Sequence, residues 1–389
     1  MTRNPFRYLK TVLAVSALLL ISALQPALAA AAGAPINVGF TTDFSGPAAT
    51  LTMQEAPVVE MIVKEINKAG GINGRPINLI TQDNASDPAK AVGNAKMFKE
   101  KYDCKVIIAG VTSSVCLALK NWADKNHVPI IAIDPASDRL LVKDGKSWFF
   151  RTEDPIFLSV EAALARMKKL GHTRIAFEGS TLAWGTDTLA MIKEKAPAYG
   201  IKVVSEALVE PKAKDLTIQV KKLKDSGAQA VFCADYEAET AGLAKAMSSV
   251  GWKPYVIHVS AANITSATKL GAPEMFNGWE TLQAADISKP LARKVYDKVR
   301  AYTGKPVDED KKVLRAYDAI SLLVAALKAS GNPDDSTAIR DAFYKLPSYE
   351  RATGKKGSKG GFVVGKNHLV DLDDEIIYSI KNGKIQPSK

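Results

Sequence analysis

The chain has 389 residues, 47% of them hydrophobic, which is enough for two domains of ordinary size with buried cores. Its 52 Lys and Arg residues outnumber its 41 acidic residues, giving a net charge of +11. The lysines are spread along predicted helix faces, and the densest basic run, Arg351 to Lys359, is Gly-rich and lacks aromatic residues. This pattern predicts solvated surface and excludes a nucleic-acid partner.

Residues 1–29 have the pattern of a secretory signal peptide. A basic start is followed by an apolar run, Thr11 to Leu24, and by the small-x-small site Ala27-Leu28-Ala29. The alternative is an uncleaved membrane anchor, but the apolar run is short for a membrane span. The first cysteine is Cys104, so a lipid-anchored lipoprotein is not expected. We expect cleavage near Ala29 and a soluble mature protein outside the cytoplasm.

Strand and helix patterns then alternate along the chain. The predicted strands are residues 36–40, 77–81, 106–109, 129–133, 147–151, 174–178, 202–207, 230–234, 255–258 and 279–283. The predicted helices are residues 58–66, 89–101, 115–125, 156–167, 186–196, 216–224, 238–250, 290–302, 311–330 and 333–344. Two short strands are expected at 362–364 and 376–380.

This alternation predicts an α/β fold with parallel sheets and helices on both faces. The series restarts after Thr152-Glu153-Asp154-Pro155, so we expect two lobes and a crossing segment there. The late helical block is too long for a tail and is expected to return to the first lobe. Ligands of open α/β sheets bind outside the carboxyl ends of the strands. The expected site is therefore a cleft between the lobes.

The three cysteines do not indicate a disulfide framework. Cys104 precedes one predicted strand and Cys116 follows it, which places them near opposite ends of the sheet. That separation exceeds the roughly 7 Å between Cα atoms that a disulfide tolerates. A bridge between them nevertheless stays open, because an oxidising compartment favours pairing.

Catalytic and metal-binding signatures are absent from the sequence. The four histidines lie in segments that suggest no shared site, and no nucleophile elbow, metal-ligand spacing or phosphate loop occurs. The run Gly70-Gly71-Ile72-Asn73-Gly74 follows a helix rather than a strand, and it is typical of a helix C-cap. We expect a binding protein with no enzymatic activity, metal or cofactor.

Several short motifs, taken in order, resemble the type I periplasmic solute-binding proteins of ABC importers, in particular the leucine/isoleucine/valine-binding family. The specific motifs are Ser45-Gly46-Pro47, the run GGINGRP at 70–76, and Asp83 with Asp87-Pro88. Supporting motifs are Val128-Pro129-Ile130, Phe150-Arg151-Thr152 and residues 171–175, GHTRI. The resemblance extends over essentially the whole mature chain.

The resemblance implies two Rossmann-like lobes joined by three crossing segments, which close on ligand by hinge motion. Lobe 1 would comprise residues 30–151 and 284–358, and lobe 2 residues 152–283 and 359–389. The implied protein is a monomeric periplasmic receptor that delivers a small ligand to an ABC permease in the inner membrane. A sensory receptor of the same fold that acts on a signalling partner is the alternative.

The turn after the strand 106–109 is the first candidate ligand site. A helix follows Gly110-Val111-Thr112 and begins with Ser113 and Ser114, so backbone N–H groups and hydroxyls can bind an anion there. In the similar family this turn holds the ligand carboxylate. Helix capping alone is the structural alternative for both serines.

The next strand leads into Asp134-Pro135-Ala136-Ser137-Asp138. The resemblance implies a ligand contact by the backbone of Ala136 and by a hydroxyl at position 138, where the family usually has threonine. Because a carboxylate beside a bound carboxylate is repelled, Asp138 either faces a ligand donor or turns toward Arg139. Ser137 is the candidate for the missing hydroxyl.

In the second lobe, Trp184 and Tyr236 match positions at which the family commonly has tyrosines over the ligand. Both follow the carboxyl end of a predicted strand. Ordinary core packing is the alternative for each.

Two departures from the family concern the ligand. Leu51 stands near a frequent tyrosine position, and Val259 or Ser260 stands where amino-acid binders have a glutamate for the ammonium. Asp138, Asp235 or Glu237 could replace that glutamate, although nothing in the sequence requires it. We therefore expect a less charged, more apolar site. A branched or aromatic carboxylate without an α-amino group is favoured over a branched-chain amino acid, and an amide or urea-type ligand is a further alternative.

Overall fold

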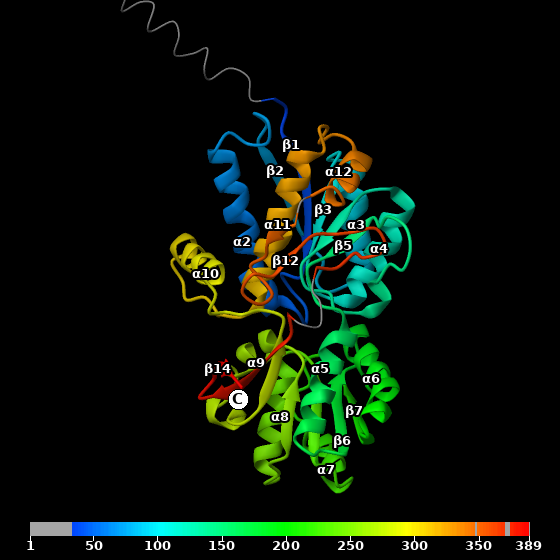
Figure 1. The fold of residues 1–389 in the computed structure, drawn as a ribbon, viewed down its shortest axis with the longest axis vertical. Helices are drawn as coiled ribbons and strands as arrows, with labels where there is room; N and C mark the ends of the chain where they lie inside the picture. The colour runs from blue at the N-terminus through cyan, green and yellow to red at the C-terminus, as the bar shows by residue number, and fades with distance from the viewer. Residues whose placement is uncertain (1–32, 347, 370–373, 389) are drawn as a thin grey trace, which may run out of the picture.

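The computed structural model describes residues 33–346, 348–369 and 374–388. The predicted signal peptide at 1–29 lies outside these residues. Within the described part, none of the helices combines the length and apolar character needed to cross a membrane. The described chain forms two α/β lobes, one above the other in Figure 1.

The first lobe is built on a parallel sheet of five strands in the order β2-β1-β3-β4-β5. These strands are β1 (Ile36–Thr42), β2 (Ile77–Asp83), β3 (Val106–Ala109), β4 (Ile130–Ala132) and β5 (Phe149–Arg151). Along β3, Val106 and Ile108 face one helical layer, whereas Ile107 and Ala109 face the other. A strand covered on both faces is continuously apolar, which explains why this run was recognisable in the sequence.

Helices from both ends of the chain cover this sheet (Figure 1). One layer contains α2 (Ala49–Lys68), α10 (Pro290–Thr303), α11 (Lys311–Ala329) and α12 (Ser336–Phe343). The other contains α3 (Pro88–Glu100) and α4 (Ser113–Asn126). The late helices thus return to the first sheet, as the length of the helical block predicts.

The second lobe has a seven-stranded sheet in the order β14-β13-β10-β9-β8-β6-β7. Its parallel strands are β6 (Arg174–Ser180), β7 (Lys202–Val209), β8 (Ala230–Ala234), β9 (Tyr255–His258) and β10 (Glu280–Gln283). Its helices are α5 (Ile156–Lys169), α6 (Ala183–Lys195), α7 (Thr217–Asp225), α8 (Glu237–Ser249) and α9 (Ala261–Ala267). Ile175 and Phe177 face the layer with α5 and α6, while Ala176 faces the layer with α7 and α8.

An antiparallel hairpin completes the edge of the second sheet. It consists of β13 (Ile376–Lys381), which pairs with β10, and β14 (Lys384–Pro387). The turn is Asn382-Gly383, and both residues have positive φ angles, of 48° and 74°. Asn-Gly is the dipeptide that a tight hairpin turn of this handedness favours, because both residues tolerate positive φ.

The strand predicted at 362–364 does not form, and this expectation was wrong. Phe362 packs its ring 4.8 Å from that of Phe150, measured between centroids, and Val363 makes only an isolated bridge to Lys366. The local pairing is instead between β11 (Tyr349–Glu350) and β12 (Lys359–Gly360). The apolar run therefore serves aromatic packing rather than a sheet.

Residues 359–369 lie with the first lobe. Phe362 and Leu369 belong to its core, and the Asn367 side chain donates to the backbone carbonyls of Leu140 and Phe149 at 2.8 and 2.9 Å. The sequence-based division assigned these residues to the second lobe. By their contacts, these residues up to Leu369 pack with the first lobe instead.

The three cysteines are buried and free. Cys104 precedes β3 and Cys116 lies on α4, so the strand separates them along the sheet.

We expect Phe150→Ala to lower the free energy of unfolding by about 3–5 kcal/mol. The Phe150 ring contacts Phe343, with centroids 4.6 Å apart, as well as Phe362, so truncation leaves a cavity between β5 and two late segments. Urea denaturation would measure the loss. Ile218→Ala, at a side chain 81% exposed, is the control and should change stability by less than about 0.5 kcal/mol. Similar losses for both variants would contradict this packing role.

Candidate ligand-binding site

A cavity that opens to solvent lies between the two lobes. Its wall comes from the carboxyl ends of strands in both sheets and from the starts of the helices that follow them. The lining residues are Leu51, Val111, Ser113, Asp134, Ala136, Glu153, Asp154, Ile156, Ser159, Val160, Trp184, Thr188, Tyr236, Val259, Ser260, Asn263 and Lys311. This is the location that the fold class predicts for a ligand.

Most of the candidate residues from the sequence come together in this cavity. Six of the eight line it: Leu51, Ser113, Ala136, Trp184, Tyr236 and Val259. Ser114 and Asp138 do not.

The two serines at the start of α4 make contacts in different places. Ser113 lines the cavity, and its hydroxyl accepts a hydrogen bond from the backbone N–H of Ser137 at 3.3 Å. The Ser114 hydroxyl instead accepts from the N–H of Ala183 at 3.4 Å, at the start of α6 in the other lobe. Ser113 is thus placed to contact a ligand, while Ser114 joins two helix starts across the cleft.

An aromatic pair forms the second-lobe wall. The rings of Trp184 and Tyr236 meet edge to face with centroids 5.5 Å apart, and both side chains are buried. Val160 and Ile156 from α5 and Val259 after β9 extend this apolar surface. The wall offers shape and apolar area to a ligand side chain.

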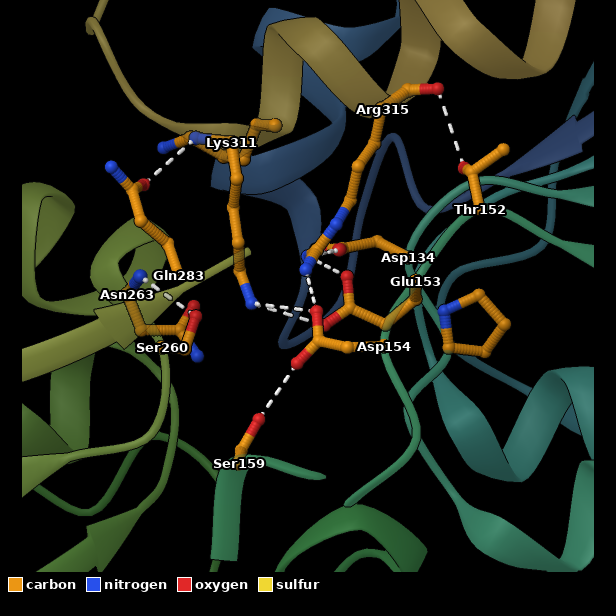
Figure 2. Close-up of polar contacts among 12 residues, drawn as sticks. Asp134, Thr152, Glu153, Asp154, Ser159, Ser260, Asn263, Gln283, Lys311 and Arg315 are labelled. Atoms are coloured by element: carbon orange, nitrogen blue, oxygen red, sulfur yellow. Dashed lines mark hydrogen bonds and ion pairs between the residues drawn. The ribbon is translucent and has the colours of Figure 1, made fainter. Parts of the chain in front are cut away.

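Charged side chains form another part of the site (Figure 2). Lys311 extends from the start of α11 and places its Nζ 3.0 Å from Glu153 Oε1 and 3.6 Å from Asp154 Oδ1. Behind it, the buried guanidinium of Arg315 pairs with Asp134, Glu153 and Asp154. Three carboxylates thus share two cations.

Burial alone would raise the pKa of Asp154, but Lys311 and hydrogen bonds with Glu375 and Ser159 hold it below its usual value. The Ser159 hydroxyl donates to Asp154 Oδ2 at 2.7 Å (Figure 2). Burial lowers the pKa of the Arg315 guanidinium, although nearby carboxylates oppose that shift. Asp154 is therefore an ionised group held in the wall of the cavity.

Comparison with known proteins identifies the family. A family model described as "Periplasmic binding protein" matches residues 35–372, which is most of the chain. The chain belongs to the periplasmic binding protein family. The resemblance seen in the sequence is thereby confirmed, together with the type I fold.

Curated relatives and solved structures agree with this assignment. The chain is 27% identical over 328 residues to "Leu/Ile/Val-binding protein homolog 3" of Brucella melitensis, covering 84% of this chain and 88% of the relative. It is 26% identical to "Leu/Ile/Val-binding protein BraC3" of Rhizobium johnstonii, covering 85% and 89%.

Two solved structures share the fold. An extracellular ligand-binding receptor from Rhodopseudomonas palustris HaA2 superposes with a TM-score of 0.80 at 20% identity, covering 92% of this chain and all of that one. LivJ from Streptococcus pneumoniae, solved in complex with isoleucine, superposes with a TM-score of 0.78 at 19% identity, covering 90% and 98%.

The sequence led us to expect a less charged and more apolar site than an amino-acid site, yet charged side chains line the cavity of this periplasmic binding protein. Asp134, Glu153, Asp154 and Lys311 all line its cavity. Asp134 follows β4, Glu153 and Asp154 follow β5, and Lys311 begins α11. These positions are distant in the sequence and come together only in the folded chain. Glu153 and Asp154 lie in the predicted crossing segment, and that location was the one feature of the sequence that could have indicated their place beside the cleft.

The acids considered as glutamate substitutes do not line the cavity. Asp235 lies beneath its wall, with one carboxylate oxygen 2.9 Å from Nε2 of the buried His258. Glu237 begins α8 and is likewise absent from the lining. Among the described residues, no group of three or more His, Cys, Asp or Glu side chains is arranged to hold a metal ion.

Asp138 turns away from the cavity and toward α5. Its Oδ2 accepts a hydrogen bond from the backbone N–H of Phe157 at 3.1 Å. Arg139 does not pair with it, because Arg139 Nε lies 3.0 Å from Asp187 in the second lobe. The Ser137 hydroxyl donates to the same Asp187 carboxylate, so Ser137 does not supply the ligand hydroxyl expected from the sequence.

We expect Asp138→Asn to change how stability depends on pH. Burial raises the pKa of Asp138 from 3.8 to about 6, with Arg151 and helix N–H groups opposing the shift. The folded protein therefore binds this proton more tightly than the unfolded chain, and the associated stability is lost as pH rises from about 4 to 6. Relative to Asp138→Asn, the native protein should lose up to about 3 kcal/mol of unfolding free energy over that range.

Denaturant titrations of both proteins at several pH values would measure the difference. Parallel pH profiles would contradict the proposed environment of Asp138.

Proposed function

We propose that this protein is an extracytoplasmic receptor for a small amino acid with an apolar side chain, of the branched-chain class. One observation supports the proposal above the others: a single cavity combines a serine at a helix start, an apolar aromatic wall and an excess of carboxylates. Those three surfaces complement a carboxylate, an alkyl side chain and an ammonium. The names of the curated relatives agree with this ligand class.

The ligand carboxylate would bind at the start of α4. The helix dipole and the free N–H groups of its first turn favour an anion there, and Ser113 adds a hydroxyl. The nearby Asp43 carboxyl accepts hydrogen bonds from the backbone N–H of Val111 at 3.1 Å and from Thr112 Oγ1 at 2.7 Å. Burial raises the pKa of Asp43, which reduces its repulsion of a second carboxylate.

The ligand ammonium would bind at the carboxylates of Asp134, Glu153 and Asp154. Because Lys311 and Arg315 supply two positive charges to these three carboxylates, one negative charge is formally uncompensated. An unpaired charge in a closed cavity costs several kcal/mol, and a ligand cation would remove that cost. A ligand without an amino group would leave it in place.

The ligand side chain would pack against Trp184, Tyr236 and Val160. Full burial of a leucine-sized side chain contributes about 1.5–3 kcal/mol. The lobes already meet at the rim through Arg139 with Asp187 on one side and Lys269 with Asp308, 2.6 Å apart, on the other. Ligand contacts from both lobes would stabilise this closed arrangement further.

The physiological role would be transport. The closed receptor would present the ligand to an ABC permease of the inner membrane, with the receptor itself in the periplasm. The predicted signal peptide and the family assignment support this role.

Isothermal titration calorimetry of the mature protein with leucine, isoleucine and valine, and with their 2-keto acids, tests the proposal. The amino acids should bind, and the keto acids should bind at least roughly tenfold more weakly, because they leave the acidic group uncompensated. Equal or tighter binding of the keto acids would overturn the assignment of the ammonium site.

Ser113→Ala should weaken amino-acid binding by about 1–3 kcal/mol, or roughly 5- to 150-fold, because it removes a hydrogen bond to a charged group. Ser248→Ala, at an exposed serine on α8, is the matched control and should bind like the native protein. Unchanged affinity in Ser113→Ala would show that the carboxylate binds elsewhere.

A further inference from the structure

A side-chain amide in the second-lobe wall of the cavity has an oxygen atom without a hydrogen-bond partner. Asn263 lies in the first turn of α9, lines the cavity and is 2% exposed. Its Nδ2 donates to the backbone carbonyl of Asp235 at 2.9 Å, and its backbone N–H donates to the Ser260 hydroxyl at 3.4 Å. Within the part of the chain that the structure describes, the buried Oδ1 has no donor.

The contact with Asp235 fixes the orientation of this amide. A backbone carbonyl only accepts hydrogen bonds, so the branch of the amide that faces it must be the NH2 group. The oxygen of Asn263 therefore occupies the other branch and cannot exchange places with the nitrogen without losing that bond. A buried carbonyl oxygen without a donor destabilises the structure around it, and a donor on a bound ligand would relieve that cost.

The start of α9 lies next to the start of α11, which carries the charged part of the site. The Nζ of Lys312 donates to the backbone carbonyl of Ala262 at 3.4 Å. Asn263 and Lys311, the neighbours of these two residues in the chain, both line the cavity. In the view of Figure 2, Asn263 and Asp154 lie on either side of the Lys311 side chain. The unpartnered oxygen thus belongs to the same region of the cavity as the carboxylates.

A ligand ammonium matches this acceptor in hydrogen bonding and in charge. It has three N–H donors, and the carboxylates of the proposed ammonium site follow β4 and β5, whereas Asn263 comes from the second lobe. Those carboxylates already exceed the two nearby cations by one negative charge, so a further carboxylate in the second lobe would be repelled. The amide oxygen of Asn263 accepts a hydrogen bond without adding charge.

We propose that Asn263 Oδ1 accepts a hydrogen bond from the ammonium of the bound amino acid and so determines specificity for amino acids over keto acids. The inference rests on the proposed function, because it needs an ammonium beside Asp154. The ammonium then contacts the segment after β5 and α9 of the second lobe together. A contact made from both sides of the cleft exists only when the lobes are closed, so it favours closure.

The test is calorimetry of Asn263→Leu, which has a side chain of similar shape and no acceptor, with leucine and with its 2-keto acid, 4-methyl-2-oxopentanoate. Leucine should bind roughly 10- to 150-fold more weakly than to the native protein, because a hydrogen bond to a charged group is lost. The affinity for the keto acid should change by less than about threefold, because that ligand has no N–H to donate.

Asn121→Leu, at an exposed asparagine on α4, is the matched control and should bind both ligands like the native protein. Unchanged leucine affinity in Asn263→Leu overturns the inference and leaves the proposed function intact. An equal loss for both ligands also overturns it, because Asn263 would then act only by shaping the start of α9. Failure of leucine, isoleucine and valine to bind the native protein overturns the proposed function and this inference together.

A crystal structure of the native protein with leucine decides the question even if the variant folds poorly. The ligand nitrogen should lie within about 3.2 Å of Asn263 Oδ1. A separation beyond about 3.5 Å, or a contact of Oδ1 with another part of the ligand, overturns the inference.

Discussion

The guanidinium of Arg315 binds together helix α11, the end of β4 and the first segment that crosses between the lobes. It is fully buried on α11, where an unpaired charge would be costly, and it pairs with Asp134 at the end of β4 and with Glu153 and Asp154 in the first crossing segment. Removing one partner from a buried ion pair typically costs 3–5 kcal/mol. The position of the first crossing relative to α11 is therefore fixed strongly by electrostatics.

Residues close to Arg315 also contact the other two segments that connect the lobes. The backbone N–H of Lys311 donates to the side chain of Gln283, 3.1 Å away, where the chain leaves β10. Glu375, where the chain enters β13, accepts a hydrogen bond from the Ser159 hydroxyl, which also donates to Asp154. The start of α11 thus lies beside the segments in which the chain passes between the two lobes. Lys311 and Asp154 also line the cavity, so the cavity shares its charged groups with the segments that join the lobes.

Much of the fold could be predicted from the sequence because its strands are covered on both faces. The bounds of β3, β8 and β9 were predicted to the residue, since each is a short apolar run between polar turns. The short helix α9 and the strand β14 were missed, although Asn382-Gly383 is a recognised hairpin signal. The strand expected at 362–364 failed because an apolar run alone does not distinguish sheet pairing from aromatic packing.

The site was predictable where it depends on local geometry and unpredictable where it depends on distant charges. Ser113, Trp184 and Tyr236 follow strand ends, and strand ends of this fold face the cleft. The acidic group could not be assembled in the same way, because Glu153 and Lys311 are more than 150 positions apart in the sequence. Asp138 follows a strand end but does not face the cleft. Its carboxylate turns toward α5 and accepts a hydrogen bond from the backbone N–H of Phe157, a contact that the local sequence does not indicate.

The return of α10, α11 and α12 to the first sheet has a consequence for how the chain acquires its structure. Val38 and Phe40 of β1 share a core with Tyr296, Leu323 and Leu327. Contacts between residues so far apart in the sequence form slowly, because closing the long loop between them lowers the chain entropy before any contact compensates for that loss. A chain still emerging from a ribosome or crossing a membrane therefore cannot bury its first strand completely. The earliest strand to be synthesised is among the last to find all of its neighbours.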